Sequence, residues 1–418
     1  MRILLCEIRK AIVSPVILTL LILFIVFNFF QMYENAYIKE DLREVNRMAE
    51  SYGTVINDEM VSLMENDYKF QMEKVNGITS KVLSKTYQDM NEFYLDNSFY
   101  TEDAFTEKEL ELFSNTVLLE MYYFTSFHVD ESFYEIDPVK IAEAEIKKYG
   151  IRGSAAELIR SQYDKFNERY SDVLKNKEYK HLFPAQSLFA THLLLFKTMF
   201  KSFLFESLIL TVLVTAYVMN FEFDRRTHLL TYSSRRGRKL WVDKLWASLI
   251  TNVGMLTLLL GIGLSAYFSV FSYQSFWNVP ISSYFNAGNW WFMSWWNLSF
   301  LEYLIAAIVL AYLLIILFTL MTVILARWIH NSYLVFFLFL CLFGVIIALQ
   351  GLIPSDNIAF VLGFFTPVHL VLNSFLWFMY NPLTFTAYFE VITVTVWFVI
   401  LLLATAFCER SFRKCDLK

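Results

Sequence analysis

The stretch Phe221-Glu-Phe-Asp-Arg-Arg-Thr-His-Leu-Leu-Thr-Tyr-Ser-Ser-Arg-Arg-Gly-Arg-Lys-Leu-Trp-Val-Asp-Lys244 lies between two long apolar runs. Its basic residues are Arg225, Arg226, Arg235, Arg236, Arg238, Lys239 and Lys244. Cytoplasmic loops of membrane proteins are enriched in lysine and arginine, so this loop is expected on the cytoplasmic side. Because consecutive spans alternate in direction, the side of this loop sets the side of every other segment.

The composition of the whole chain is that of a membrane protein. Of its 418 residues, 56% are apolar and 18% are aromatic, which exceeds the apolar content of ordinary soluble domains. Several apolar runs reach about 20 residues, the length that crosses the hydrocarbon core of a bilayer. The sequence therefore predicts an all-α polytopic membrane protein with six transmembrane helices.

The net charge of −5 conceals two parts of opposite sign. Residues 33–180 hold 30 acidic and 18 basic residues, whereas the rest of the chain holds 10 acidic and 17 basic residues. Helix-start signals recur in this acidic block, such as Thr106 three residues before a glutamate and Asp137 before a proline. We therefore predict a large, mostly helical extracellular domain at 33–182, between the first and second spans.

The first ten residues, 1–10, combine apolar and basic side chains at helical spacing. Ile3, Leu4 and Ile8 share one side of such a helix, which is typical of an amphipathic segment on the inner membrane surface. A signal-peptide n-region is the alternative. The apolar run at 11–32 is long for a signal peptide and no small-residue cleavage pattern follows it, so we predict an uncleaved first span.

The remaining segments follow from the apolar runs and the alternation of sides. We predict an interfacial lead-in at 183–202, spans at 203–220, 245–271, 299–326, 333–352 and 385–407, a cytoplasmic loop at 221–244 and a cytoplasmic tail at 408–418. With the first span, this gives six spans and two cytoplasmic termini.

The apolar stretch 358–380 is interrupted by Gly363, Pro367, His369 and Asn373. A full span here would place the basic C-terminal tail outside, against the positive-inside tendency. We therefore predict re-entrant or interfacial helices that return to the outer side, where protein or water satisfies the backbone at the breaks. A complete span is the alternative.

Three carboxylates lie in or near the predicted spans: Glu206, Glu302 and Glu390. Ionisable residues inside a membrane are costly and are functional candidates by default. We take Glu206 and Glu390, together with His369 in the re-entrant stretch, as candidates for a substrate pathway or a gate. The structural alternatives are that Glu206 pairs with Lys201 and that Glu302 is solvated at the outer end of its span.

No residue spacing in the sequence is typical of an enzyme or a metal centre. The four cysteines are Cys6, Cys341, Cys408 and Cys415. None lies in the acidic block, so no disulfide framework is expected, and no Cys/His pattern suggests zinc. We predict no catalytic residues, no metal site and no nucleic acid partner.

Two further patterns concern packing. The aromatic belt expected at the outer membrane boundary consists of Trp277, Trp290, Trp291, Trp295 and Trp296. In the third predicted span, Gly254, Gly261 and Gly263 allow close approach of a neighbouring helix.

The topology and the basic loop together resemble the ABC-2 type transporter permeases. In that family an acidic residue that closes span two is followed by a threonine, a serine-rich basic run and a lysine that opens span three. Here these are Glu222, Thr227, Ser233-Ser234-Arg235-Arg236 and Lys244. The glycine that follows the threonine in the family is replaced by His228, and a large domain between spans one and two occurs in only part of the family.

The resemblance implies a permease subunit of an ABC exporter that moves a peptide, lipid-like or drug-like substrate out of the cell. It implies two ABC ATPase subunits that hold ATP and Mg, since this sequence contains no GxxxxGK[ST] motif and no cofactor is expected on the chain itself. It also implies a second permease subunit, identical or different. The bacterial plasma membrane, with its lipids, is the expected location.

The loop at 221–244 would then couple ATP hydrolysis to the spans, with Trp241 adding an aromatic ring for the ATPase to grip. The coupling residues implied are Glu222, Asp224, Arg225, Arg226, Thr227, Arg235, Arg236, Arg238, Lys239 and Lys244. Two other functions stay open: a membrane sensor or scaffold with a ligand-binding extracellular domain, and an ion exporter of the same ABC-2 class.

Overall fold

The structure is a computed structural model that describes residues 2–97, 104–184, 193–234, 237–287, 293–380 and 386–414. Within these ranges the chain is helical, with three isolated β-bridges and no strand. Six of the described helices are long and apolar enough to cross a membrane. The predicted all-α polytopic membrane fold with six spans is therefore confirmed at the level of helix number and length.

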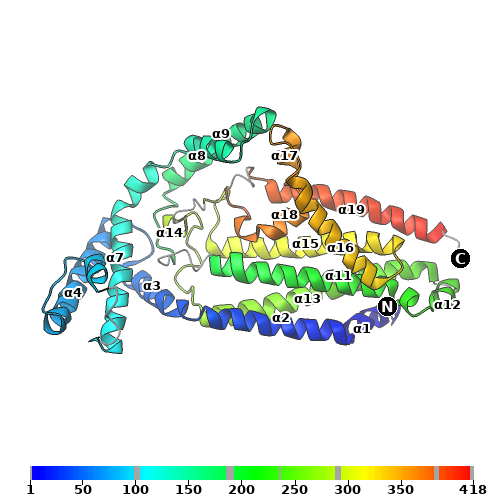
Figure 1. Ribbon diagram of the computed structural model, residues 1–418, viewed down its shortest axis with the longest axis horizontal. Coiled ribbons are helices and arrows are strands. Elements are labelled where there is room, and N and C mark those ends of the chain that lie inside the picture. Colours follow the sequence, from blue (N-terminus) through cyan, green and yellow to red (C-terminus); the bar gives the residue numbers. More distant parts are fainter. Residues whose placement is uncertain are drawn as a thin grey trace.

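The six long helices lie side by side in one bundle (Figure 1). They are α2 (Pro15–Glu34), α11 (Phe200–Asp224) with the π-helical η1 (Leu193–Met199) directly before it, α13 (Leu240–Val270), α15 (Phe300–Trp328), α16 (Ser332–Gln350) and α19 (Phe389–Lys414). Both ends of the described chain lie at one end of the bundle, which we call the termini end. A short helix, α1 (Arg2–Ile12), precedes α2 there.

At the opposite end, which we call the arch end, the acidic block folds into a curved row of helices (Figure 1). This arch domain contains α3 (Ile38–Tyr52), α4 (Asp58–Val82), α5 (Met90–Asp96), α7 (Glu107–Tyr134), α8 (Pro138–Lys148) and α9 (Gly153–Asn176). The capping signals in the sequence work as expected. Asp137 accepts hydrogen bonds from two backbone amides of α8, and Thr106 forms a capping box with Glu109 at the start of α7.

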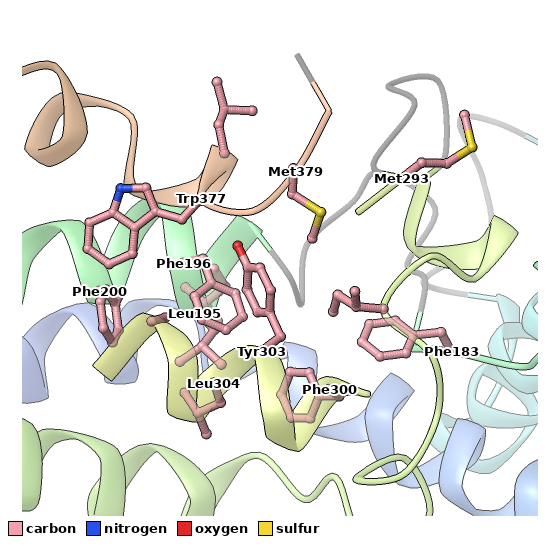
Figure 2. Packing of buried hydrophobic residues seen from close by; sticks show 14 of the residues in the cluster. Phe183, Leu195, Phe196, Phe200, Met293, Phe300, Tyr303, Leu304, Trp377 and Met379 are labelled. Carbon is pink, nitrogen blue, oxygen red and sulfur yellow. The ribbon is translucent and has the colours of Figure 1, made fainter. Parts of the chain in front are cut away.

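The arch domain and the bundle share one hydrophobic core at their junction. Phe196 and Phe200 at the start of the second span pack on Tyr303 and Trp377, with ring centroids 4.7 Å and 5.7 Å apart; Figure 2 shows this group. All four rings are buried, and truncating a buried aromatic residue to alanine typically costs about 3–5 kcal/mol. The arch domain joins the same core, since Phe166 of α9 stacks on Tyr380 with ring centroids 3.7 Å apart. The arch domain is therefore packed directly against the bundle.

Arg169 on α9 fixes the arch domain to a loop of the bundle. Its guanidinium pairs with Glu178 at 2.8 Å and 2.5 Å and donates to the backbone carbonyls of Ser294 and Trp296 at 3.1 Å and 3.3 Å. Both side chains are nearly buried. One planar fork thus joins two segments that are far apart in the sequence.

The stretch 358–380 forms α17 (Ile358–Leu362), α18 (Pro367–Leu372) and the 3-10 helix η3 (Ser374–Leu376). At about 1.5 Å per residue, none of these helices is long enough to cross a bilayer. They lie at the arch end (Figure 1), with the peptide groups at their breaks hydrogen-bonded within the protein, as between Tyr380 N and Met293 O at 2.7 Å.

Helix α16 packs least closely of the six spans. Only 11% of its apolar stretch is buried within the molecule, against 72% for the second span. It is attached at both ends. At the termini end Ser332 hydrogen-bonds Asp224, and beyond the other end Ser355 Oγ donates to Gly150 O at 2.9 Å.

Of the three glycines expected to allow close helix packing, one does so. A Cβ on Gly263 would lie 2.4 Å from the Phe203 ring of α11, whereas Gly254 and Gly261 have no atom within 4 Å of that position. The third span therefore approaches the second through a single glycine.

The second span starts earlier than predicted. The predicted lead-in at 183–202 is helical and buried from its second half onward, because the junction core packs over it. The second span accordingly runs over Leu194–Asp224 and not over 203–220. Trp290 and Trp291 of the expected aromatic belt lie outside the described residues.

Candidate functional site

The connection between α11 and α13 lies at the termini end, next to α1 (Figure 1). It contains a six-residue helix, α12 (His228–Ser233), and a 3-10 turn, η2 (Gly237–Lys239). Arg235 and Arg236 lie outside the described residues, and only the backbone of Arg238 is described. The predicted loop at 221–244 is therefore mostly helical in its described residues: residues 221–224 end α11, and residues 240–244 begin α13.

A sharp turn at Arg226 separates α11 from α12. Arg226 has φ 57°, in the left-handed region. The amide of Thr227 donates to Glu222 O at 2.8 Å and that of Arg226 to Phe223 O at 3.0 Å. This is the hydrogen-bond pattern that closes a helix C-terminus with a left-handed residue, and it fixes the direction in which α12 leaves.

Four charged side chains from three helices meet at the base of this connection. Glu222 at the end of α11 pairs with Lys244 near the start of α13 through one oxygen. Its other oxygen contacts Lys10 of α1 at 3.0 Å, and Lys10 also reaches Glu7 at 2.7 Å. Lys244 is 1% exposed and donates further to Met219 O at 3.0 Å. We call these four residues the charge cluster.

The charge cluster balances two acidic against two basic groups. Burial alone would lower the pKa of Lys10, but its hydrogen bonds to Glu7 and Glu222, and their negative charges, exceed this effect and raise it. Lys10 therefore stays charged at neutral pH, as the pairing with Glu222 requires. The cluster ties α1, α11 and α13 to one point.

An open cleft of about 320 Å³ borders the charge cluster. Its lining residues are Ile3, Glu7, Lys10, Phe221, Glu222, Thr227, Thr231, Ser234, Gly237 and Leu240. Helix α12 forms one wall of this cleft and is held on its other side by Tyr232, which is buried against Phe412 of α19 with ring centroids 5.2 Å apart.

The outward surface of the connection is both apolar and basic. Leu229 and Leu230 on α12 are 52% and 79% exposed. Arg225, Arg226 and Lys239 are exposed beside them. This combination, on an element anchored to the bundle, fits a soluble partner with an apolar and acidic surface.

The structure divides the coupling residues implied by the resemblance into two groups. Glu222 and Lys244 are buried in the charge cluster, whereas Thr227 is exposed and Asp224 holds the start of α16 through Ser332. The expectation that Trp241 offers its ring to a partner is wrong. Trp241 is 3% exposed and packs in a small core with residues of α11, α15 and α19.

The three candidates for a pathway or gate do not come together. Glu206 receives a hydrogen bond from Asn28 of α2 at 2.7 Å, and the alternative pairing with Lys201 is wrong. Glu390, at the start of α19, accepts from the backbone amide of Phe378 at 2.7 Å. His369 on α18 is 8% exposed, and its ring contacts Thr366 at 2.7 Å.

Glu302 is an exposed capping residue, since it forms a capping box with Ser299 at the start of α15. This agrees with the solvated alternative for Glu302. Among the described residues, no group of three or more His, Cys, Asp or Glu side chains could hold a metal ion.

A second open cleft, of about 530 Å³, lies where α3 meets the end of α13. It is lined mostly by charged and polar residues: Lys39, Glu40, Arg43, Glu44, Asn46, Arg47, Glu50, Val270, Ser272 and Gln274. Asn46 joins its two sides by donating to Ser272 O at 2.8 Å.

Sequence reasoning missed Glu7, Lys10, Asn28 and Arg169. A signal existed for Asn28, which is the only strongly polar residue in the apolar stretch 15–30. The sequence gives no such signal for Glu7, Lys10 or Arg169, because each lies in a segment that holds several other charged residues.

A scan against protein-family models, a search of curated proteins and a search of solved structures each found no match to this chain.

Proposed function

We propose that this chain is the membrane-spanning subunit of an ABC exporter of the ABC-2 type. It moves a peptide, lipid-like or drug-like substrate out of the cell, while separate ATPase subunits hydrolyse ATP at the termini end. Two ATPase subunits and a second permease subunit complete the transporter. Both termini and the connection at α12 then face the cytoplasm of a bacterial cell.

One observation carries the proposal. Helix α12 exposes apolar and basic side chains, and the charge cluster at its base joins α1, α11 and α13. A partner that pushes or pulls on α12 therefore acts on three helices at once. A soluble ATPase needs such an attachment to drive a membrane subunit, because its conformational change must reach the spans through physical contact.

The test is purification of the tagged full chain in mild detergent from cells that express its native neighbours. We expect a nucleotide-binding subunit in stoichiometric amount, with ATPase activity in the purified complex. The test variant combines Leu230→Glu with Arg225→Glu, both at exposed positions, and is expected to lose the ATPase subunit. The matched control is Lys165→Glu with Lys175→Glu on α9, also exposed, which should retain it.

A chain that purifies without any ATPase contradicts the proposal. An ATPase that stays bound to the Leu230→Glu, Arg225→Glu variant leaves the transporter possible but moves the attachment away from α12.

The charged cleft of about 530 Å³ between α3 and α13 favours a second function, a membrane sensor whose arch domain binds a polar ligand. A chain that purifies alone would support this function if small polar molecules raise its unfolding temperature and Arg43→Glu abolishes the increase. The same chain with no response to any polar ligand would count against it.

A further inference from the structure

Glu206 lies in the membrane-spanning part of α11 and has no charged partner. Glu206 is only 5% exposed. Among the described residues its hydrogen-bond partner is Asn28 of α2, whose Nδ2 donates to Glu206 Oε2 at 2.7 Å. Asn28 is 3% exposed. One turn nearer the arch end, Ser202 Oγ donates to Gln31 Oε1 at 3.1 Å. Uncharged polar groups thus join α2 to α11 along this line.

The same helix provides a direct contrast. Glu222, also buried, is paired with Lys244 and Lys10, so its negative charge is compensated within the protein. Glu206 receives one hydrogen bond from a neutral amide. A buried carboxylate with neither a cation nor a full set of donors is strongly disfavoured as an ion, and such a group ordinarily becomes neutral.

The unpartnered atoms around Glu206 indicate how it becomes neutral. Glu206 Oε1 and Asn28 Oδ1 are both buried acceptors without a hydrogen bond. Protonation turns Oε1 into an O–H donor, for which Asn28 Oδ1 is an unused acceptor. A carboxylic acid and a primary amide can make two reciprocal hydrogen bonds, and Asn28 Nδ2 already supplies one of them.

The ionisable groups on the neighbouring elements do not supply a compensating charge. On α13, Lys244 is committed to Glu222, and Tyr267 hydrogen-bonds Tyr273 at 2.9 Å. The other such groups on α2, α11 and α13 are Tyr33, Glu34, Lys197, Lys201, Tyr217, Glu222, Asp224 and Asp243. On α15 and α16, which also pack against α11, they are Glu302, Tyr303, Tyr312, Arg327, Tyr333 and Cys341. None of them forms an ion pair with Glu206.

The groove beside Asn28 leaves no space for water. A narrow groove reaches Asn28 between α2 and α13, where Ile25, Phe29, Leu259 and Gly263 line it, and it has no room for a water molecule. On this side of the pair, hydration therefore cannot replace the missing cation, since the groove has no water-sized space.

We propose that the Glu206–Asn28 pair is a proton-binding site inside the membrane, occupied at neutral pH by one proton on Glu206 Oε1 that Asn28 Oδ1 accepts as a hydrogen bond. The proposal does not depend on the transporter function. It assigns the proton as the ligand and leaves the contact between α2 and α11 uncharged.

Infrared spectroscopy of the purified full chain in lipid nanodiscs tests this directly, because protonated and ionised carboxyl groups absorb in separate regions. We expect that Glu206→Gln at neutral pH removes a carboxylic acid C=O band and leaves the carboxylate bands unchanged. Asn28→Leu, which keeps Glu206, should shift the same C=O band. Glu390→Gln is the matched control, since Glu390 is another deeply buried carboxyl of the spans, accepts from a backbone amide and, unlike Glu222, forms no ion pair among the described residues. This control should leave the Glu206 band in place.

Loss of carboxylate absorption in Glu206→Gln at neutral pH would overturn the proposal, because it would identify Glu206 as an ion. Acid C=O absorption that Glu206→Gln leaves undiminished would also overturn it, and so would a Glu206 band that Asn28→Leu leaves unshifted. Either of the variants at positions 206 and 28 is sufficient for the decision if the other does not fold.

Discussion

At the termini end, four charged side chains from three helices meet in a buried cluster, whereas at the arch end aromatic rings and one arginine fork hold the helices to the loops. The two ends should therefore respond differently to mutation. In the charge cluster each group depends on its partners, so removal of one leaves an uncompensated charge. At the arch end many contacts stabilise the same junction, so the loss of one contact should lower the free energy of unfolding less.

The largest effect is expected from Glu222→Gln at the termini end. It leaves Lys244 buried without a counterion, and breaking a buried ion pair from one side costs about 3–5 kcal/mol. Denaturant unfolding of the purified chain in detergent measures the loss. The double variant Glu222→Gln, Lys244→Met should recover most of it, because no unpaired charge is left buried and Lys10 still pairs with Glu7. If the single variant were as stable as the wild type, the ion pairs of the charge cluster would not be what stabilises the termini end.

Arg169→Lys should have the next largest effect, at the arch end. Lysine keeps the charge but cannot reproduce the planar fork that serves Glu178 and two carbonyls, so a loss of about 2 kcal/mol in unfolding free energy is expected. Arg160→Lys is the matched control, since Arg160 makes a similar two-point pair with Glu143 in an exposed position. Equal behaviour of the two variants would show that burial of the fork is unimportant.

Gly263→Ala probes the bundle between the two ends. Its Cβ would meet the buried ring of Phe203 at 2.4 Å, and overpacking of this kind costs about 1–2 kcal/mol. Gly261→Ala, two residues away with open space around it, should be neutral or slightly stabilising. The comparison is made by the thermal unfolding of both variants in the same detergent.

The smallest effect concerns pH at the arch end. Burial lowers the pKa of His181 below its ordinary value of 6.5, so the unfolded chain binds this proton more readily than the folded one. The stability that follows is complete above pH 6.5 and declines as the pH falls through the folded value. Wild type should therefore lose more stability on acidification than His181→Asn. Identical pH profiles would exclude this residue as a source of acid sensitivity.

The number of spans and the caps of the arch domain could be predicted from the sequence because they depend on local patterns. A run of about 20 apolar residues is a membrane span almost regardless of context. Asp137 before Pro138 caps α8 in the structure as the pattern indicates. The sequence also singled out Glu222 and Lys244, through the resemblance of their loop to one family.

The contacts among these residues could not be predicted, because they depend on where α1 lies. Nothing in the sequence around Lys10 indicates that it reaches Glu222, which is 212 positions away. The partner of Glu206 was missed for the same reason: Lys201 is near in sequence, but five residues along a helix place it on another side. Long-range pairing therefore separates what the sequence predicts from what only the structure reveals.

Helix α16 is attached at its two ends but is sparsely packed along its length. With 19 residues, α16 is about 28 Å long, and only 11% of its apolar stretch is packed within the molecule. One tip is hooked to Asp224, beside the charge cluster, and the chain beyond the other tip is hooked to the turn between α8 and α9. Helix α16 therefore connects the surroundings of the charge cluster to the turn between α8 and α9 as one straight element anchored at both ends.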